Sequence, residues 1–211
     1  MTDSPAARAH DEFYVAKRLD GMAGAQRIVF SIACSQILWS AYCRISQETG
    51  SERPAVFDEA LAELWSMAKG EREAAGISAF DPPVFEASPH DDSEDWTDSS
   101  GFLQSTGIAL INAINGVATG SWQNSVFAAR QISEIAEYIV DLAKDDAEEE
   151  GASVDEEYVL NHAKNLVYRQ VEVVARWHAG EPIDINAVVA GCQRDGEDLG
   201  AIALREINFE G

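Results

Sequence analysis

The sequence is poor in positive charge. Its 211 residues include 15 Lys and Arg against 37 Asp and Glu, which gives a formal net charge of −22. Nucleic-acid interfaces need clustered basic side chains to neutralise phosphates, and anionic membrane surfaces also attract basic segments. The composition therefore predicts a protein that binds neither nucleic acid nor a membrane surface.

Cysteine is scarce as well. Cys34, Cys43 and Cys192 show no C-x-x-C spacing, and an odd count does not suit a disulfide framework. The first residues, MTDSPAARAHDEF, contain acids and lack the apolar stretch of a secretory signal. The most apolar stretch, 102–118, is interrupted by polar side chains, so no run of about 18 apolar residues is expected to span a membrane. These absences predict a cytoplasmic protein with reduced cysteines.

Recognisable catalytic and metal motifs are missing too. None of the four histidines follows a Glu-x-x-His or His-x-x-x-His pattern, and zinc cysteine spacings are absent. The nucleophile elbow, the P-loop and the dinucleotide fingerprint are also absent. We therefore expect no resident cofactor and assign no catalytic residue, which argues against an enzyme without excluding one.

What the chain has in quantity is helical periodicity. Apolar residues recur at i, i+3, i+4 and i+7 in at least five segments, whereas strand-type alternation is scarce. This predicts an all-α fold: a single domain over 1–211, a bundle of six to seven helices around a central apolar helix at 102–119. Segment 25–48 is apolar nearly all round, as in a buried helix. Ser153 and Glu156 fit a capping box, and Asp184 is a candidate N-cap of the last helix.

Three segments depart from this pattern. Residues 70–100 form an acidic excursion with Pro82, Pro83 and Pro89, and such long excursions within a compact domain are often functional. Residues 145–152 read as an acidic connection between helices. Residues 202–207 suit either a short strand or a docked tail, so the structure of 196–211 stays open.

The acids are concentrated in two windows. Residues 81–98 hold seven acids and no Lys or Arg, and residues 134–157 hold eleven acids and one base, Lys144. Between them, residues 99–133 contain no acid and one base, Arg130. Such clusters form solvated faces more often than sites. Their position in space decides between these two readings: a shared face forms a patch, whereas opposite ends indicate a role in solubility alone.

This charge pattern, together with the missing catalytic motifs, favours a non-catalytic binding protein for a basic or regulatory protein partner. An acidic patch steers a basic protein and speeds association. The sequence identifies neither the partner nor the oligomeric state, and a homodimer stays open.

An alternative is an enzyme, or a metal- or ligand-binding protein, that uses the acidic loop Asp91–Asp95. Asp91, Asp92 and Asp95, with His90 beside them, are the candidate metal ligands or acid–base groups. Hard cations bind carboxylates gathered in a loop, and paired carboxylates can divide acid and base roles. The loop lacks an EF-hand register, and capping of the following helix explains part of the cluster without a ligand.

Several segments match a known family in their order and spacing. They are Ile28-Val29-Phe30 with Ala33-Cys34, Tyr42 with Glu48-Thr49-Gly50, Leu61-x-x-Leu64-Trp65, Pro89 with Asp91 and Asp92, the apolar helix from Phe102, and the helix near Glu156 and Glu157. On these segments, from about Phe13 to Ile202, the chain resembles the YjaG-like family of bacterial helical proteins, whose function is unknown. The N-terminal tail and residues 145–151 depart from the family pattern. The resemblance implies a compact, all-helical cytosolic protein and supplies no catalytic residues.

Calorimetric titration of the metal-free protein with Mg²⁺, Ca²⁺, Mn²⁺ and Zn²⁺ tests the loop hypothesis. A metal site at Asp91–Asp95 is expected to give a saturable heat with at least one of these ions, since carboxylates in a loop suit hard cations. No binding by any of the four would leave the hypothesis with little support.

The variants Asp91→Asn, Asp92→Asn and Asp95→Asn test whether the loop is structurally engaged. We expect at least one to lower the free energy of unfolding by about 0.5–2 kcal/mol, because a run this acidic needs a fixed donor beside the N-terminus of the next helix. Urea midpoints measure the effect. Three midpoints at or above that of the wild type, with unchanged slopes, would show that none of these carboxylates is engaged.

Overall fold

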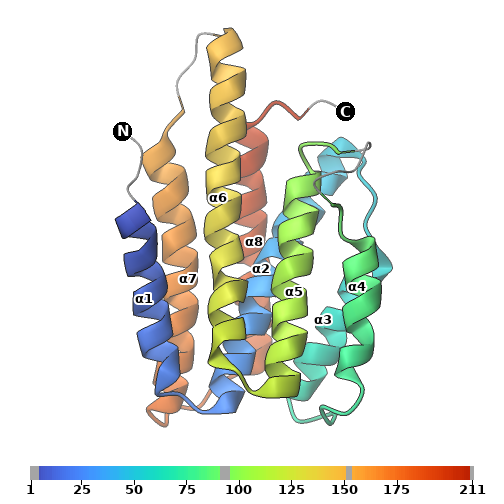
Figure 1. Cartoon of the computed structure of the whole chain (residues 1–211), viewed down its shortest axis with the longest axis vertical. Helices are drawn as coiled ribbons and strands as arrows, with labels where there is room; N and C mark the ends of the chain where they lie inside the picture. Colours follow the sequence, from blue (N-terminus) through green and yellow to red (C-terminus); the bar gives the residue numbers. More distant parts are fainter. Residues whose placement is uncertain (1–4, 91–95, 151–153, 210–211) are drawn as a thin grey trace.

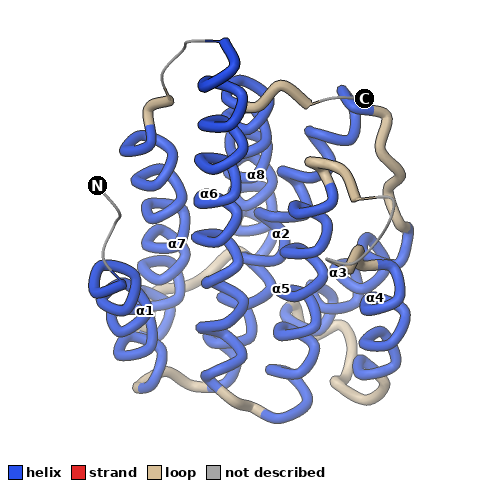
Figure 2. Tube along the Cα trace, turned by 45° about the horizontal axis from the view of Figure 1, so that its top comes forward, coloured by secondary structure: helices blue, strands red, loops and turns tan. Residues whose placement is uncertain are grey.

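The computed structural model describes residues 5–90, 96–150 and 154–209, apart from the side chains of 5–11 and 148–150. These residues form eight α-helices, one short 3-10 helix (η1) and no strand (Figures 1 and 2). The helices are α1 (Pro5–Asp20), α2 (Gly24–Thr49), α3 (Ala55–Ala68), η1 (Ile77–Phe80), α4 (Asp81–Ala87), α5 (Ser100–Thr119), α6 (Trp122–Glu150), α7 (Glu156–His178) and α8 (Ile185–Glu206). The all-α prediction is confirmed.

Two apolar helices share the centre of the bundle. The predicted helix α5 contacts α2, α3, η1, α4 and α6, and α2 contacts α3, α5, α6, α7 and α8. In Figure 1, α2 and α8 run behind α5 and α6, while α1 and α7 form one side and α3 and α4 the other. The predicted central apolar helix is therefore present, and α2 is buried beside it.

α2 carries a few polar side chains, and they form hydrogen bonds inside the core. Ser35 donates to the backbone oxygen of Ser31 at 3.1 Å, one turn earlier in the same helix. The Gln36 side chain donates to the Ser40 hydroxyl and accepts from the Trp65 indole of α3, both at 3.1 Å. A buried polar group costs free energy only while it lacks a partner, so these contacts let α2 be covered on nearly all sides.

α2 and α8 approach each other more closely than most side chains allow. A Cβ atom placed on Gly196 would lie 2.2 Å from the backbone oxygen of Ile37, and one placed on Gly200 would lie 2.7 Å from that of Ala41. Real Cβ atoms essentially never come within 3.0 Å of such atoms. Residues four apart share one helix face, so the two glycines together open the face of α8 that meets α2.

Two aspartates start the last two long helices. The carboxylate of Asp184 accepts from the backbone amides of Asn186 and Ala187, which confirms the predicted cap of α8. The cap of α7 differs from the prediction. Asp155 occupies the N-cap and accepts from the amide of Tyr158 at 3.0 Å, two residues after the expected Ser153, which itself lies outside the described residues.

The departures from the predicted pattern lie at helix ends. α6 continues through Asp145 to Glu150, although the sequence predicts a connection at 145–152. Ion pairing of Lys144 with Glu156, at 3.0 Å, ties this part of α6 to the start of α7. The excursion 70–100 contains η1 and α4, and the additional short helix raises the number above the predicted six to seven. Residues 202–206 belong to α8, so they form neither a strand nor a tail.

One described helix is long and apolar enough to cross a membrane by length and composition alone. It is α2, and 83% of its most apolar window is buried inside the bundle. That burial is the property of a core helix.

Gly196→Ala is expected to lower the free energy of unfolding by about 1–3 kcal/mol, because the added methyl group meets the backbone of α2 and forces the helices apart. Urea denaturation measures the change. Gly191→Ala in the same helix is the matched control, since nothing lies within 4 Å of its Cβ position. Alanine there should raise stability by about 0.5–1 kcal/mol through helix propensity. Equal effects of the two substitutions would contradict the close approach.

Candidate functional site

Five helix ends meet at one end of the bundle. Lys144 of α6 pairs with Glu156 at the start of α7. The backbone amide of Asn208, just after α8, donates to Asp146 of α6 at 2.8 Å. The hydroxyls of Ser51, after α2, and Ser99, before α5, lie 2.9 Å apart. The ends of α2, α6 and α8 thus lie beside the beginnings of α5 and α7, at the top of Figure 1.

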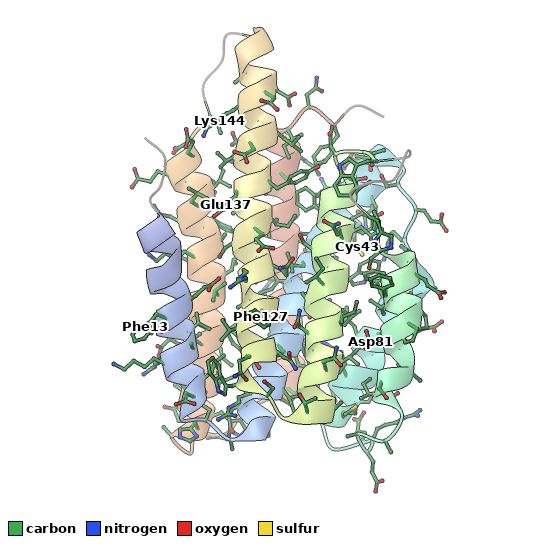
Figure 3. All side chains as sticks on the ribbon, viewed as in Figure 1. Phe13, Cys43, Asp81, Phe127, Glu137 and Lys144 are labelled. Carbon is green, nitrogen blue, oxygen red and sulfur yellow. The ribbon has the colours of Figure 1, made fainter. Side chains whose placement is uncertain are left out.

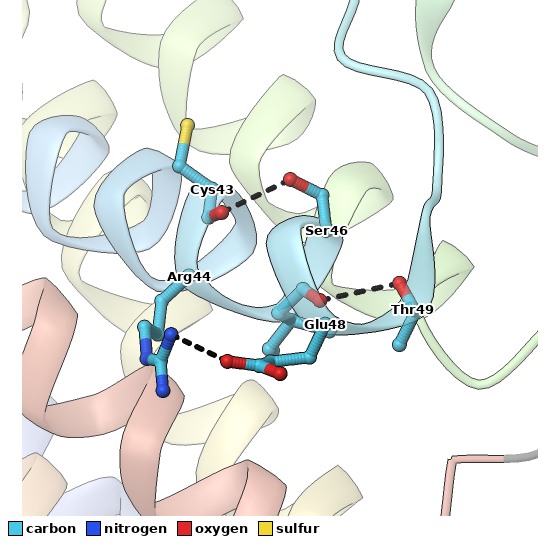
Figure 4. Close-up of polar contacts among 6 residues, drawn as sticks. Cys43, Arg44, Ser46, Glu48 and Thr49 are labelled. Carbon is cyan, nitrogen blue, oxygen red and sulfur yellow. Dashed lines mark hydrogen bonds and ion pairs between the residues drawn. The ribbon is translucent and has the colours of Figure 1, made fainter.

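Acidic side chains are concentrated at this end, which we name the acidic end. Its described acids come from both sequence windows and from the neighbouring helix ends: Glu48, Glu52, Asp98, Asp141, Asp145, Asp146, Asp155, Glu156, Glu157 and Glu206. The bases near them pair locally, as Arg44 does with Glu48 at 2.8 Å (Figure 4), and Arg205 with Glu206 at 2.6 Å. Acids outnumber bases there, so this end carries a surplus of negative charge.

The last part of α6 makes the acidic end prominent. α6 rises above the neighbouring helices in Figure 1, and Figure 3 places Lys144 near its top with Glu137 two turns lower. Asp141 and Asp145 are exposed. Acids in the last turns of a helix oppose its macrodipole, by about 0.3–1 kcal/mol each at low ionic strength. Asp145 therefore lowers the stability of α6 through its interaction with the helix dipole.

The acids at the start of α7 have the opposite relation to their helix. Glu156 and Glu157 lie in its first turn, where the positive end of the macrodipole favours anions. The acidic end thus combines acids that stabilise a helix with acids that do not. Helix stability alone does not account for their common position.

The candidate loop residues are described only in part. Asp91, Asp92 and Asp95 lie outside the described residues. His90 is exposed, and its ring lies 4.9 Å from that of Phe85 in α4. Among the residues that the structure describes, no group of three His, Cys, Asp or Glu side chains is placed to hold a metal ion.

Trp96 fixes the end of this loop to the bundle. Its indole N–H donates to the hydroxyl of Tyr138 in α6. Burial raises the pKa of Tyr138, the indole bond opposes that shift, and the nearby Asp98 carboxylate adds to it. The bond explains why residue 96 is half-buried although its window is acidic.

A polar cluster that the sequence does not predict lies between α7 and α8. Asp195 is 7% exposed; Arg169 lies 2.9 Å from its Oδ1, and Gln170 donates to Oδ2 at 3.3 Å. Burial raises the pKa of Asp195, and Arg169 opposes that shift. Both carboxylate oxygens are engaged within the protein, so this cluster holds the two helices together. The only sequence signal was an acid on the apolar face of the last helix.

The surroundings of the cysteines disfavour their thiolate forms. Cys34 and Cys192 are buried, and Cys43 is half-buried. Burial raises the pKa of Cys192 to about 12 and that of Cys43 to about 11. The thiolate is the reactive form, so these positions do not suit a nucleophile.

Comparisons with known proteins place the fold. No protein-family model matches the chain, and no curated protein matches its sequence. The chain is similar to a DUF416 family protein from Shewanella baltica OS155, whose crystal structure superimposes on it with a TM-score of 0.62. The two sequences are 19% identical, and the superposition covers 87% of this chain and 93% of the Shewanella protein. The chain therefore shares its fold with a protein of an uncharacterised family.

Proposed function

We propose that this chain is a non-catalytic binding protein that engages a basic protein partner through the acidic end. The observation that supports the proposal most is the gathering, at one end of the bundle, of most described acids of the second window together with Asp98 of the first. Asp81 of the first window lies apart from them, near the end of α5, where Asn115 donates to it. Asp98, just before α5, belongs to the first window and Asp145, near the end of α6, to the second, and both lie toward the end of the bundle where α5 begins and α6 ends.

Electrostatics gives this surface a kinetic role. Surfaces that concentrate one sign of charge attract oppositely charged partners over distances of about a Debye length, roughly 8–10 Å at physiological salt. Such steering raises association rates by roughly 10 to 10³-fold, and it weakens as salt is added. With a net charge of −22, the chain repels nucleic acid and favours a basic protein.

The same proposal includes membership of an uncharacterised family and a location in the bacterial cytoplasm. The shared fold with a DUF416 family protein supports membership of a family without known activity, and the quoted sequence segments favour the YjaG-like family. Free cysteines with raised pKa values suit the reducing cytoplasm of a bacterium.

Removal of charge from the acidic end tests the proposal. The triple variant Asp141→Asn, Asp145→Asn, Glu157→Gln replaces three exposed acids. We expect immobilised wild-type protein to capture basic proteins from an extract of its native cells at low salt, and the variant to lose most of that capture. Quantitative mass spectrometry of the captured proteins, repeated at high salt, provides the measurement.

The matched control removes the same charge elsewhere. Glu59→Gln, Glu71→Gln and Glu73→Gln alter three exposed acids on α3 and the turn after it. This control should capture the same proteins as the wild type. Equal capture by all three forms, or capture without any preference for basic proteins, would contradict the proposal.

A further inference from the structure

A cavity of about 500 Å³ lies between α6 and α7, beside α1. Its size falls within the roughly 300–1,000 Å³ typical of small-molecule sites. Its walls come from residues 126–137 of α6 and 160–168 of α7, and none of the acids of the acidic end lines it. The apolar part of the wall consists of Val15, Ala129, Ala136, Leu160, Ala163 and Val167.

Small side chains on the facing helices account for the space. Ala129 and Ala136 of α6 and Ala163 of α7 are at most 4% exposed, and all three line the cavity. A leucine at any of these positions would fill volume that alanine leaves open. The alanines of the sequence therefore leave this cavity open. They also give it an apolar floor that suits the apolar part of an organic molecule.

The polar rim favours a positive charge. Glu12, Arg130, Glu134, Glu137 and Lys164 line it, so acids outnumber bases. Arg130 is neutralised by Glu12, which accepts from both its Nε and its Nη2. The ammonium of Lys164 lies 5.6 Å from the centre of the Tyr168 ring. Both bases are thus engaged by groups of the protein itself.

Glu134 is positioned to meet a ligand. It is exposed at the mouth of the cavity, and Gln131 donates to its Oε2 at 2.6 Å. That hydrogen bond fixes the carboxylate while its Oε1 can accept a second donor. We propose that the cavity binds an organic cation, an amine with an apolar body, whose ammonium pairs with Glu134 while the body lies on the alanine floor.

The opposite charge is disfavoured at the same place. An organic anion would meet the Glu134 carboxylate in the field of a chain whose net charge is −22. A neutral molecule of the same shape would gain the apolar contact alone. Preference for a cation is therefore the property that separates this site from an unspecific apolar hollow.

Octylamine and octanoate are matched probes, since they share an alkyl chain and differ in the sign of their charge. Isothermal titration calorimetry of the full chain at physiological salt should give saturable binding of one octylamine and affinity for octanoate at least tenfold weaker. Equal affinities would overturn the preference for a cation. Absence of binding by both would overturn the site.

Variants locate the binding. Ala163→Leu should abolish binding of octylamine, because the larger side chain takes up part of the cavity, and its melting curve checks that this buried change leaves the protein folded. Glu134→Gln, an exposed change that leaves the core intact, should weaken binding about tenfold through loss of the ion pair. Glu59→Gln on α3 is the charge-matched control and should leave the affinity unchanged. Full binding by either cavity variant would contradict the assignment.

The acidic-end variant separates this inference from the proposed function. Asp141→Asn, Asp145→Asn, Glu157→Gln lies outside the cavity wall and should retain octylamine affinity within twofold. Loss of octylamine binding in that variant would show that the amine associates with the acidic end instead, and the cavity assignment would then be wrong.

Discussion

The direct contact between the backbones of α2 and α8 is the constraint on which the bundle depends. Gly196 and Gly200 bring α8 within reach of the backbone oxygens of Ile37 and Ala41. That approach covers α2 at Ser40, and α3 covers the neighbouring Gln36 through the Trp65 indole. Once α2 is enclosed, α5, α6 and α7 pack around it, and their ends are fixed relative to one another.

This arrangement explains how acids distant in sequence become neighbours. The first window precedes α5, and the second begins in α6 and ends in α7. Since α5 and α6 form an antiparallel hairpin, α6 returns to the level at which α5 begins and continues beyond it. The buried faces of α5 and α6 hold the two helices side by side in this arrangement. The surplus of charge at one end is thus a consequence of packing, and no contact between the acids themselves is needed to bring them together.

Residues with a local signal could be predicted from the sequence, and residues that depend on tertiary contacts could not. Asp184 caps α8 because an N-cap needs only its own backbone neighbours. The extent of α6 past Asp145 was missed, since like charges oppose its dipole and the support comes from Lys144 pairing with Glu156. The cavity was missed for the same reason: Ala136 and Ala163 read as ordinary core residues until the two helices are placed side by side.

The lengths of the hairpin helices bear on how the acidic end meets a partner. α6 has 29 residues and α5 has 20, so α6 continues about 14 Å beyond the matched length at 1.5 Å per residue. Its exposed acids are held on a helix, and their backbone is already ordered before a partner arrives. A disordered acidic tail would lose that conformational freedom on binding, which lowers affinity. The acids at the end of α6 are unfavourable for the helix itself. Because the helix is packed on the core, however, it holds these acids in fixed positions for a partner.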